Sequence, residues 1–167
     1  MLAYVFWHRP RDGVDAAAYV ASLTAFHERI GVPSWFAALE RPPWSEDAGW
    51  YEDWYLVEEW NGLGRLNETA VTGSRRAPHD AAAALVADGI AGVYALVGGR
   101  PERPGWAGWL AKPADVGYEA FEPALRAAAG SGSVWKRQMV LGPTPEFVVL
   151  APGPVPLPWA AVQTRPG

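Results

Sequence analysis

The feature that most constrains this chain is an internal recurrence of one element order. The segment WHRPRDGVDAAAYVASL, residues 7–23, aligns with LAKPADVGYEAFEPAL, residues 110–125, if one deletion is allowed near Asp115. Further on, SWFAALERPP, residues 34–43, aligns without gaps to VWKRQMVLGP, residues 134–143. Strand, turn, helix and hairpin signals recur in the same order in both copies. We therefore expect two diverged copies of one folding unit.

The first copy opens with a strand and a helix. Residues 2–9 are rich in β-forming residues and are closed by a turn that starts at Pro10. Residues 15–31 place apolar side chains at helical spacing, and Gly31 is a typical residue at the end of a helix. Runs beginning at Ser34 and Trp50 then predict a β-hairpin.

The rest of the first copy predicts two helices and a strand. Helices are expected over residues 63–71 and 78–89, the second with Pro78 in its first turn, and a strand over residues 91–99. The resulting order is βαββαβ, the ferredoxin-like arrangement with helices on one face of an antiparallel sheet.

These patterns divide the chain into three parts. We expect a ferredoxin-like repeat over residues 1–99, a linker over 100–104 and a shortened ferredoxin-like repeat over 105–167. The proline-rich stretch from residue 154 excludes a full second helix and leaves a connector and a last strand around residues 159–164.

The tandem order resembles the dimeric α+β barrel superfamily, to which ethyl-tert-butyl-ether-degradation-like and stress-responsive barrel proteins belong. The resemblance implies an α+β fold in which two ferredoxin-like repeats with antiparallel sheets form a barrel that often holds a small apolar ligand. Some members are cofactor-independent oxygenases or isomerases. None of their catalytic motifs is present here, so the resemblance transfers no functional residue.

The first strand supports paired sheets independently, because it is apolar on both faces. Alternation places Leu2, Tyr4, Phe6 and His8 on one face and Ala3, Val5, Trp7 and Arg9 on the other. One face of a four-stranded sheet is covered by its helices, and the other needs a second cover. A second sheet is therefore expected opposite the first.

His8 is the first candidate for a catalytic residue. It ends an aromatic strand face and is replaced by Ala111 in the second copy, so it could act as an acid or a base. The alternative is a histidine bonded to a loop carbonyl. We expect a ligand cavity near His8, lined by Tyr4, Phe6, Trp54 and Trp109.

Arg75, Arg76 and His79 form a second candidate site. The expected helix start at Pro78 would place them at a helix N-terminus, where an anionic ligand is favoured. The alternative is that the arginines pair with the acidic stretch between Trp44 and Trp60.

Other polar residues are weaker candidates. His27 lies near a helix end, where its charge or its hydrogen bonding suits the terminus, and we assign it no role. Seven residues lie inside predicted strands with undecided orientation: Glu40, Arg41, Asp53, Tyr55, Lys136, Arg137 and Gln138.

Composition limits the expected partners. The net charge of -4 disfavours nucleic acid, and no apolar run is long enough to span a membrane. The lack of cysteine is compatible with a cytoplasmic location. We expect no cofactor and no metal.

Two functions remain open from the sequence. The leading one is binding of a small apolar or aromatic molecule in the barrel cavity, extended to oxygenation or isomerisation if the protein is an enzyme. The alternative is a non-catalytic interaction or oligomerisation module with a filled barrel, for which a homodimer is one expected assembly.

Overall fold

The computed structural model describes residues 1–42, 44–140 and 143–164. Within these ranges the first half of the chain forms four strands and three helices. Their bounds are β1 Leu2–Pro10, α1 Ala16–His27, β2 Ser34–Leu39, β3 Trp50–Val57, α2 Trp60–Ala70, α3 Gly73–Ala83 and β4 Val86–Gly98.

The described part of the second half contains four strands and one helix. Their bounds are β5 Trp106–Leu110, α4 Tyr118–Ala129, β6 Ser133–Val140, β7 Phe147–Ala151 and β8 Val162–Thr164. Residues 152–161 form an irregular connector where the first half has its second and third helices. The prolines of this stretch lack the N–H groups that a helix requires.

All eight described strands belong to one antiparallel sheet, with neighbours in the order β2-β3-β1-β4-β6-β7-β5-β8. The first half contributes β2-β3-β1-β4 and the second β6-β7-β5-β8, which is the same order counted from the start of each half. The halves join where β4 pairs with β6. The α+β class with a ferredoxin-like antiparallel strand order is thereby confirmed.

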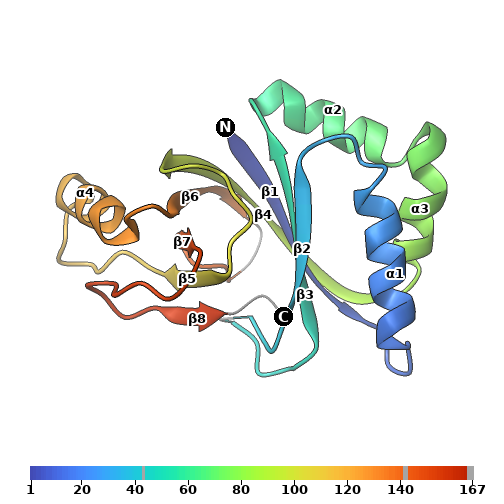
Figure 1. Ribbon diagram of the computed structural model, residues 1–167, viewed down its shortest axis with the longest axis horizontal. Helices are drawn as coiled ribbons and strands as arrows, with labels where there is room; N and C mark the ends of the chain where they lie inside the picture. Colours follow the sequence, from blue (N-terminus) through green and yellow to red (C-terminus); the bar gives the residue numbers. More distant parts are fainter. Residues whose placement is uncertain (43, 141–142, 165–167) are drawn as a thin grey trace.

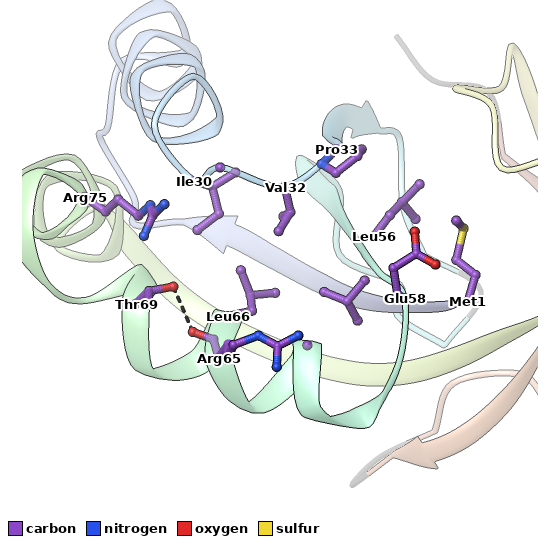
Figure 2. A pocket seen from close by; sticks show the side chains of 13 residues that line it. Met1, Ile30, Val32, Pro33, Leu56, Glu58, Arg65, Leu66, Thr69 and Arg75 are labelled. Atoms are coloured by element: carbon purple, nitrogen blue, oxygen red, sulfur yellow. Dashed lines mark hydrogen bonds between the residues drawn. The ribbon is translucent and has the colours of Figure 1, made fainter.

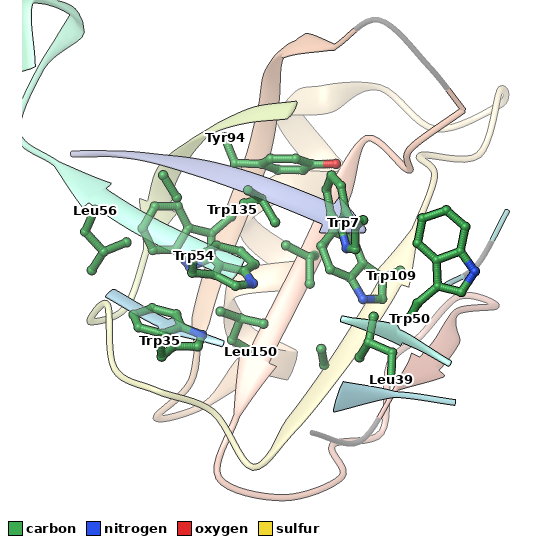
Figure 3. Close-up of a cluster of buried hydrophobic side chains, with 14 residues drawn as sticks. Trp7, Trp35, Leu39, Trp50, Trp54, Leu56, Tyr94, Trp109, Trp135 and Leu150 are labelled. Carbon is green, nitrogen blue, oxygen red and sulfur yellow. The ribbon is translucent and has the colours of Figure 1, made fainter. Parts of the chain in front are cut away.

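The sheet curls so that its two halves face one another, with α1, α2 and α3 outside the first half and α4 outside the second (Figure 1). One core of buried side chains lies between the halves (Figure 3). Its aromatic members come from six strands: Trp7, Trp35, Trp50, Trp54, Tyr94, Trp109 and Trp135. These residues fill the interior that the sequence suggested as a ligand cavity.

Trp35 stacks on Trp54 in this core, and the other ring pairs are tilted or edge-to-face. The ring centroids of Trp54 and Trp135 are 5.5 Å apart, and those of Trp7 and Trp109 are 5.3 Å apart. Trp44, from the loop between β2 and β3, packs edge-on against Trp7 at 4.8 Å. Such arrangements add to the stabilisation from buried area because ring edges meet ring faces.

Helix α1 forms where the sequence predicted it. The Asp15 carboxylate accepts a hydrogen bond from the Ala18 N–H and caps the helix N-terminus. Tyr19, Leu23 and Phe26 are buried against the sheet. Gly31 follows in the left-handed region at φ 79°, a conformation that lets the chain turn back into β2.

Two elements have wrong predicted boundaries. Helix α3 spans Gly73–Ala83 and not residues 78–89, so Pro78 lies inside the helix. Strand β4 begins at Val86 and not at residue 91. In both cases tertiary contacts extend the element, since α3 packs against α1, and the start of β4 pairs with the end of β1 through Pro10 and Val86.

No helix among the described residues combines the length and the apolar character needed to cross a bilayer.

Candidate functional site

The two faces of the first half-sheet separate the residues that the sequence expected around one cavity. Tyr4 packs with the helix-facing cluster that includes Phe26 and Tyr55. Trp54 and Trp109 lie in the central core, on the opposite face. His8 stacks on Phe6 and contacts Tyr19 of α1, so it also faces the helices. The expected single cavity is therefore not formed.

A buried carboxylate, Asp53 of β3, is the centre of the polar network on the helix-facing side. His8 Nε2 lies 3.0 Å from one carboxylate oxygen of Asp53. The Tyr55 hydroxyl donates to the other oxygen at 2.8 Å. His8 Nδ1 makes a short contact with the Tyr19 hydroxyl. The Nε2 contact is an ion-pair distance, and the donor and acceptor roles in the Nδ1 contact depend on the tautomer of His8.

His27, at the last turn of α1, belongs to the same network. Its Nδ1 is 2.9 Å from the Ser34 hydroxyl, and its Nε2 is 3.6 Å from Asp53 Oδ2. Its ring stacks on Tyr55. The sequence treated His27 as a residue that suits a helix terminus, but its side chain turns inward and links α1 to β2 and β3.

The charge of Asp53 is stabilised by its neighbours. Burial alone would raise the pKa of this carboxyl, but the contacts of His27 and His8 outweigh burial and lower the pKa to about 2. Asp53 is 3% exposed and His8 is 1% exposed. The network thus joins helix and sheet around an ionised group that is closed to solvent.

The neighbouring residue, Glu52, carries a second buried carboxylate to the opposite face of β3. Its two oxygens accept hydrogen bonds from the indole N–H groups of Trp7 and Trp54, each at 2.7 Å. Burial raises the pKa of Glu52 to about 7, against the opposing effect of the hydrogen bonds from Trp54 and Trp7. The aromatic core thus favours the protonated form of Glu52 more than water does.

Neither carboxylate forms part of a cluster suited to a metal. Among the residues with described positions, no group of three or more histidine, cysteine, aspartate or glutamate side chains has the arrangement of a metal site.

A pocket lies on the helix side of the first half-sheet (Figure 2), and neither carboxylate lines it. It has a volume of about 280 Å³ and lies between the loop that joins α1 to β2, the end of β3, and α2. Its floor is apolar, and its rim carries charged groups. The lining residues are Met1, Ile30, Gly31, Val32, Pro33, Leu56, Val57, Glu58, Gly62, Arg65, Leu66, Thr69 and Arg75.

Gly62 sets one wall of this pocket, because it lets α2 approach β3. A Cβ atom at this position would lie 3.2 Å from the Cβ of Val57, which is closer than packed carbon atoms ordinarily come. The sequence analysis did not find this pocket. Its walls come from segments far apart in the chain, and in the sequence Gly62 indicated only the end of the preceding strand.

The three residues expected to bind an anion at a helix N-terminus lie in the first two turns of α3, and their side chains contact protein groups. Arg75 donates from Nε to the carbonyl oxygen of Arg29 at 2.9 Å. Arg76 and His79 both contact Asp80 on the same helix. The alternative pairing of the arginines with the acidic stretch is also wrong. Of the three, Arg75 lines the pocket.

A second hollow, of about 530 Å³, lies at the end of β5. Trp109 and Arg137 line it together with Thr144, Glu146 and the connector residue Ala161. Residues 141–142, which precede its lining residue at position 143, lie outside the described part of the chain.

The remaining polar candidates contact their local surroundings. Glu40 and Arg41 lie in the loop after β2, where Arg41 pairs with Glu46 at 2.9 Å. Lys136 pairs with Glu122 of α4 at 2.7 Å. Arg137 bonds to the carbonyl oxygen of Thr144, and Gln138 bonds to neighbouring backbone oxygens.

The chain is similar in fold to a solved structure. No protein-family model matches the chain, and no curated protein matches it either. Among solved structures, the chain is similar to a dimeric ferredoxin-like protein of unknown function from Thermobifida fusca. The identity is 16% and the TM-score 0.45, over 57% of this chain and 90% of the other.

Proposed function

We propose that the protein binds a small apolar molecule in the pocket between the loop that joins α1 to β2, β3 and α2. The observation that supports this is a space of about 280 Å³ outside the central aromatic core, whose lining includes the apolar residues Ile30, Val32 and Leu66. This volume is at the lower end of ligand pockets, so it suits a small apolar molecule.

The proposed site is the helix-side pocket, whereas the sequence led us to expect a ligand in the barrel interior. A ligand in that interior would have to displace buried indole rings such as those of Trp7, Trp54 and Trp135, each 0% exposed. Displacement would cost the packing energy of large side chains, several kcal/mol each. The helix-side pocket needs no such displacement.

Oxygenation or isomerisation is not part of this proposal. His8, which the sequence analysis chose as the acid or base, is buried, and its two ring nitrogens face Tyr19 and Asp53. A general base must come within hydrogen-bond reach of a substrate proton. The buried network offers no such approach to a substrate in the pocket.

A fluorescence titration with the neutral dye N-phenyl-1-naphthylamine tests the proposal. We expect saturable enhancement with the unaltered protein and at least a tenfold loss of affinity in Thr69→Phe, which places a ring in the pocket. Asn67→Phe is the matched control, because Asn67 is exposed on the same helix and does not line the pocket. Equal binding by both variants, or no binding by the unaltered protein, would contradict the proposal.

The filled interior favours a second candidate function, an interaction module without a ligand. It predicts a stable oligomer and no saturable dye binding, which light scattering coupled to size exclusion and the same titration would reveal. Three further expectations belong to the proposal: homodimer formation, a cytoplasmic location and membership of the dimeric α+β barrel superfamily.

A further inference from the structure

The helix-side pocket carries two guanidinium groups on its lining. Arg65 projects from α2 and Arg75 from α3, and Figure 2 shows both beside the apolar side chains of Ile30 and Leu66. Among the described residues, no hydrogen bond or ion pair engages the guanidinium of Arg65 within 4 Å. Its donors are available to a ligand at the pocket mouth.

Arg75 is held in place by α1. Its Nε donates to the Arg29 carbonyl oxygen, which fixes the guanidinium at the end of that helix. The absence of a side chain at Gly31 makes room for it, since a Cβ there would lie 2.5 Å from Arg75 Nη2. The Nε of Arg75 is therefore engaged by the protein, while its guanidinium group lines the pocket.

The charges give the pocket a direction. Its acidic lining residue, Glu58, lies near Met1, and Arg75 lies at the other end (Figure 2). Arg65 lies between them on the α2 side. An anionic group is thus favoured on the side of the two arginines and disfavoured at the Glu58 end, with apolar side chains lining the space between.

From this arrangement we infer that the ligand is a small monocarboxylate with a short apolar body, whose carboxylate is bound by Arg65 with the support of Arg75. The inference rests on the proposed function and adds the chemical class of the ligand. A planar carboxylate matches the fork of guanidinium N–H donors. The apolar body lies on Ile30, Val32 and Leu66.

The test compares 4-phenylbutyrate with its neutral amide, each measured by displacement of N-phenyl-1-naphthylamine. We expect the carboxylate to bind about fivefold more tightly than the amide, a gain typical of a charge-assisted contact at a partly solvated site. Arg65→Gln should abolish this preference, because it removes the charge that distinguishes the acid from the amide. Arg76→Gln is the control, because Arg76 is exposed on α3, pairs with Asp80 and does not line the pocket.

The outcomes separate this inference from the proposed function. The inference would be overturned if the unaltered protein bound acid and amide equally, or if the preference for the acid persisted in Arg65→Gln. In either case, saturable binding of the dye would still support the proposed function. If neither the dye nor either ligand binds, both fail. Weaker preference at high salt would support the inference, since exposed ion pairs are screened.

Discussion

At the scale of single residues, the adjacent side chains of Glu52 and Asp53 are two buried carboxylates on opposite faces of β3. Asp53 is surrounded by histidine and tyrosine, and its pKa is lowered to about 2. Glu52 accepts from two indoles, and its pKa is raised to about 7. The same element thus stabilises an ionised group toward the helices and holds a readily protonated group toward the core.

Sequence alone could indicate Asp53 and Tyr55 as polar residues inside a strand, but it could not connect them to their partners. Because side chains alternate along β3, Asp53 and Tyr55 lie on one face of the strand. Their partners His8 and His27 come from β1 and α1, and only the packing of α1 decides which face they share. His27 had a sufficient local explanation as a helix-terminal residue, so no signal pointed to its inward orientation.

Glu52 makes stability depend on pH. Below its ordinary pKa of 4.5 the carboxyl is protonated in both the folded and the unfolded chain. Between pH 4.5 and about 7 the unfolded chain ionises first, so the free energy of unfolding falls with rising pH, by roughly 3 kcal/mol in all. Urea unfolding of the unaltered protein and of Glu52→Gln across this range measures the effect.

Glu52→Gln should remove this part of the pH dependence, since the amide does not titrate. Glu58→Gln is the control, because Glu58 is exposed at the end of β3. The difference between the unaltered protein and each variant isolates one carboxyl from all others. If Glu52→Gln kept the full slope, the assignment of a raised pKa to this residue would be wrong.

At the scale of elements, α1 and α4 occupy corresponding positions in the two halves. Tyr19 and Leu23 of α1 are buried, as are Phe121 and Leu125 of α4, the residues that the sequence alignment paired with them. The alignment could predict this because helical spacing and burial leave a strong pattern even when identities are few. Element limits were less predictable, as the early starts of α3 and β4 show.

The correspondence predicts equal sensitivity of the two helices to truncation. Leu23→Ala and Leu125→Ala should each lower the free energy of unfolding by about 2–5 kcal/mol, the cost of removing a buried leucine side chain. Val20→Ala is the control on α1, since Val20 is 38% exposed, and it should cost less than about 1 kcal/mol. Urea unfolding measures all three. A small effect at Leu125 alone would show that α4 packs less tightly than α1.

At the scale of the whole molecule, one curled sheet encloses an aromatic core. The helix-side pocket lies outside this core, and residues of α2 and α3 help to line it. Element order and two-sided strand burial predicted two facing half-sheets. They could not show whether the enclosed space is empty, because the ten tryptophans of the sequence suit a lined cavity and a filled core equally. Side-chain volume and strand register decide that, and both depend on the closed structure.

The most direct test of this account is a titration with N-phenyl-1-naphthylamine followed by ¹⁵N–¹H correlation spectroscopy. The account predicts shifts of the backbone amides of Gly31, Val57 and Gly62, which line the helix-side pocket. The indole N–H signals of Trp7, Trp54 and Trp135 in the core should remain unchanged. Shifts of these indole signals with unchanged pocket amides would contradict it, since the ligand would then occupy the barrel interior.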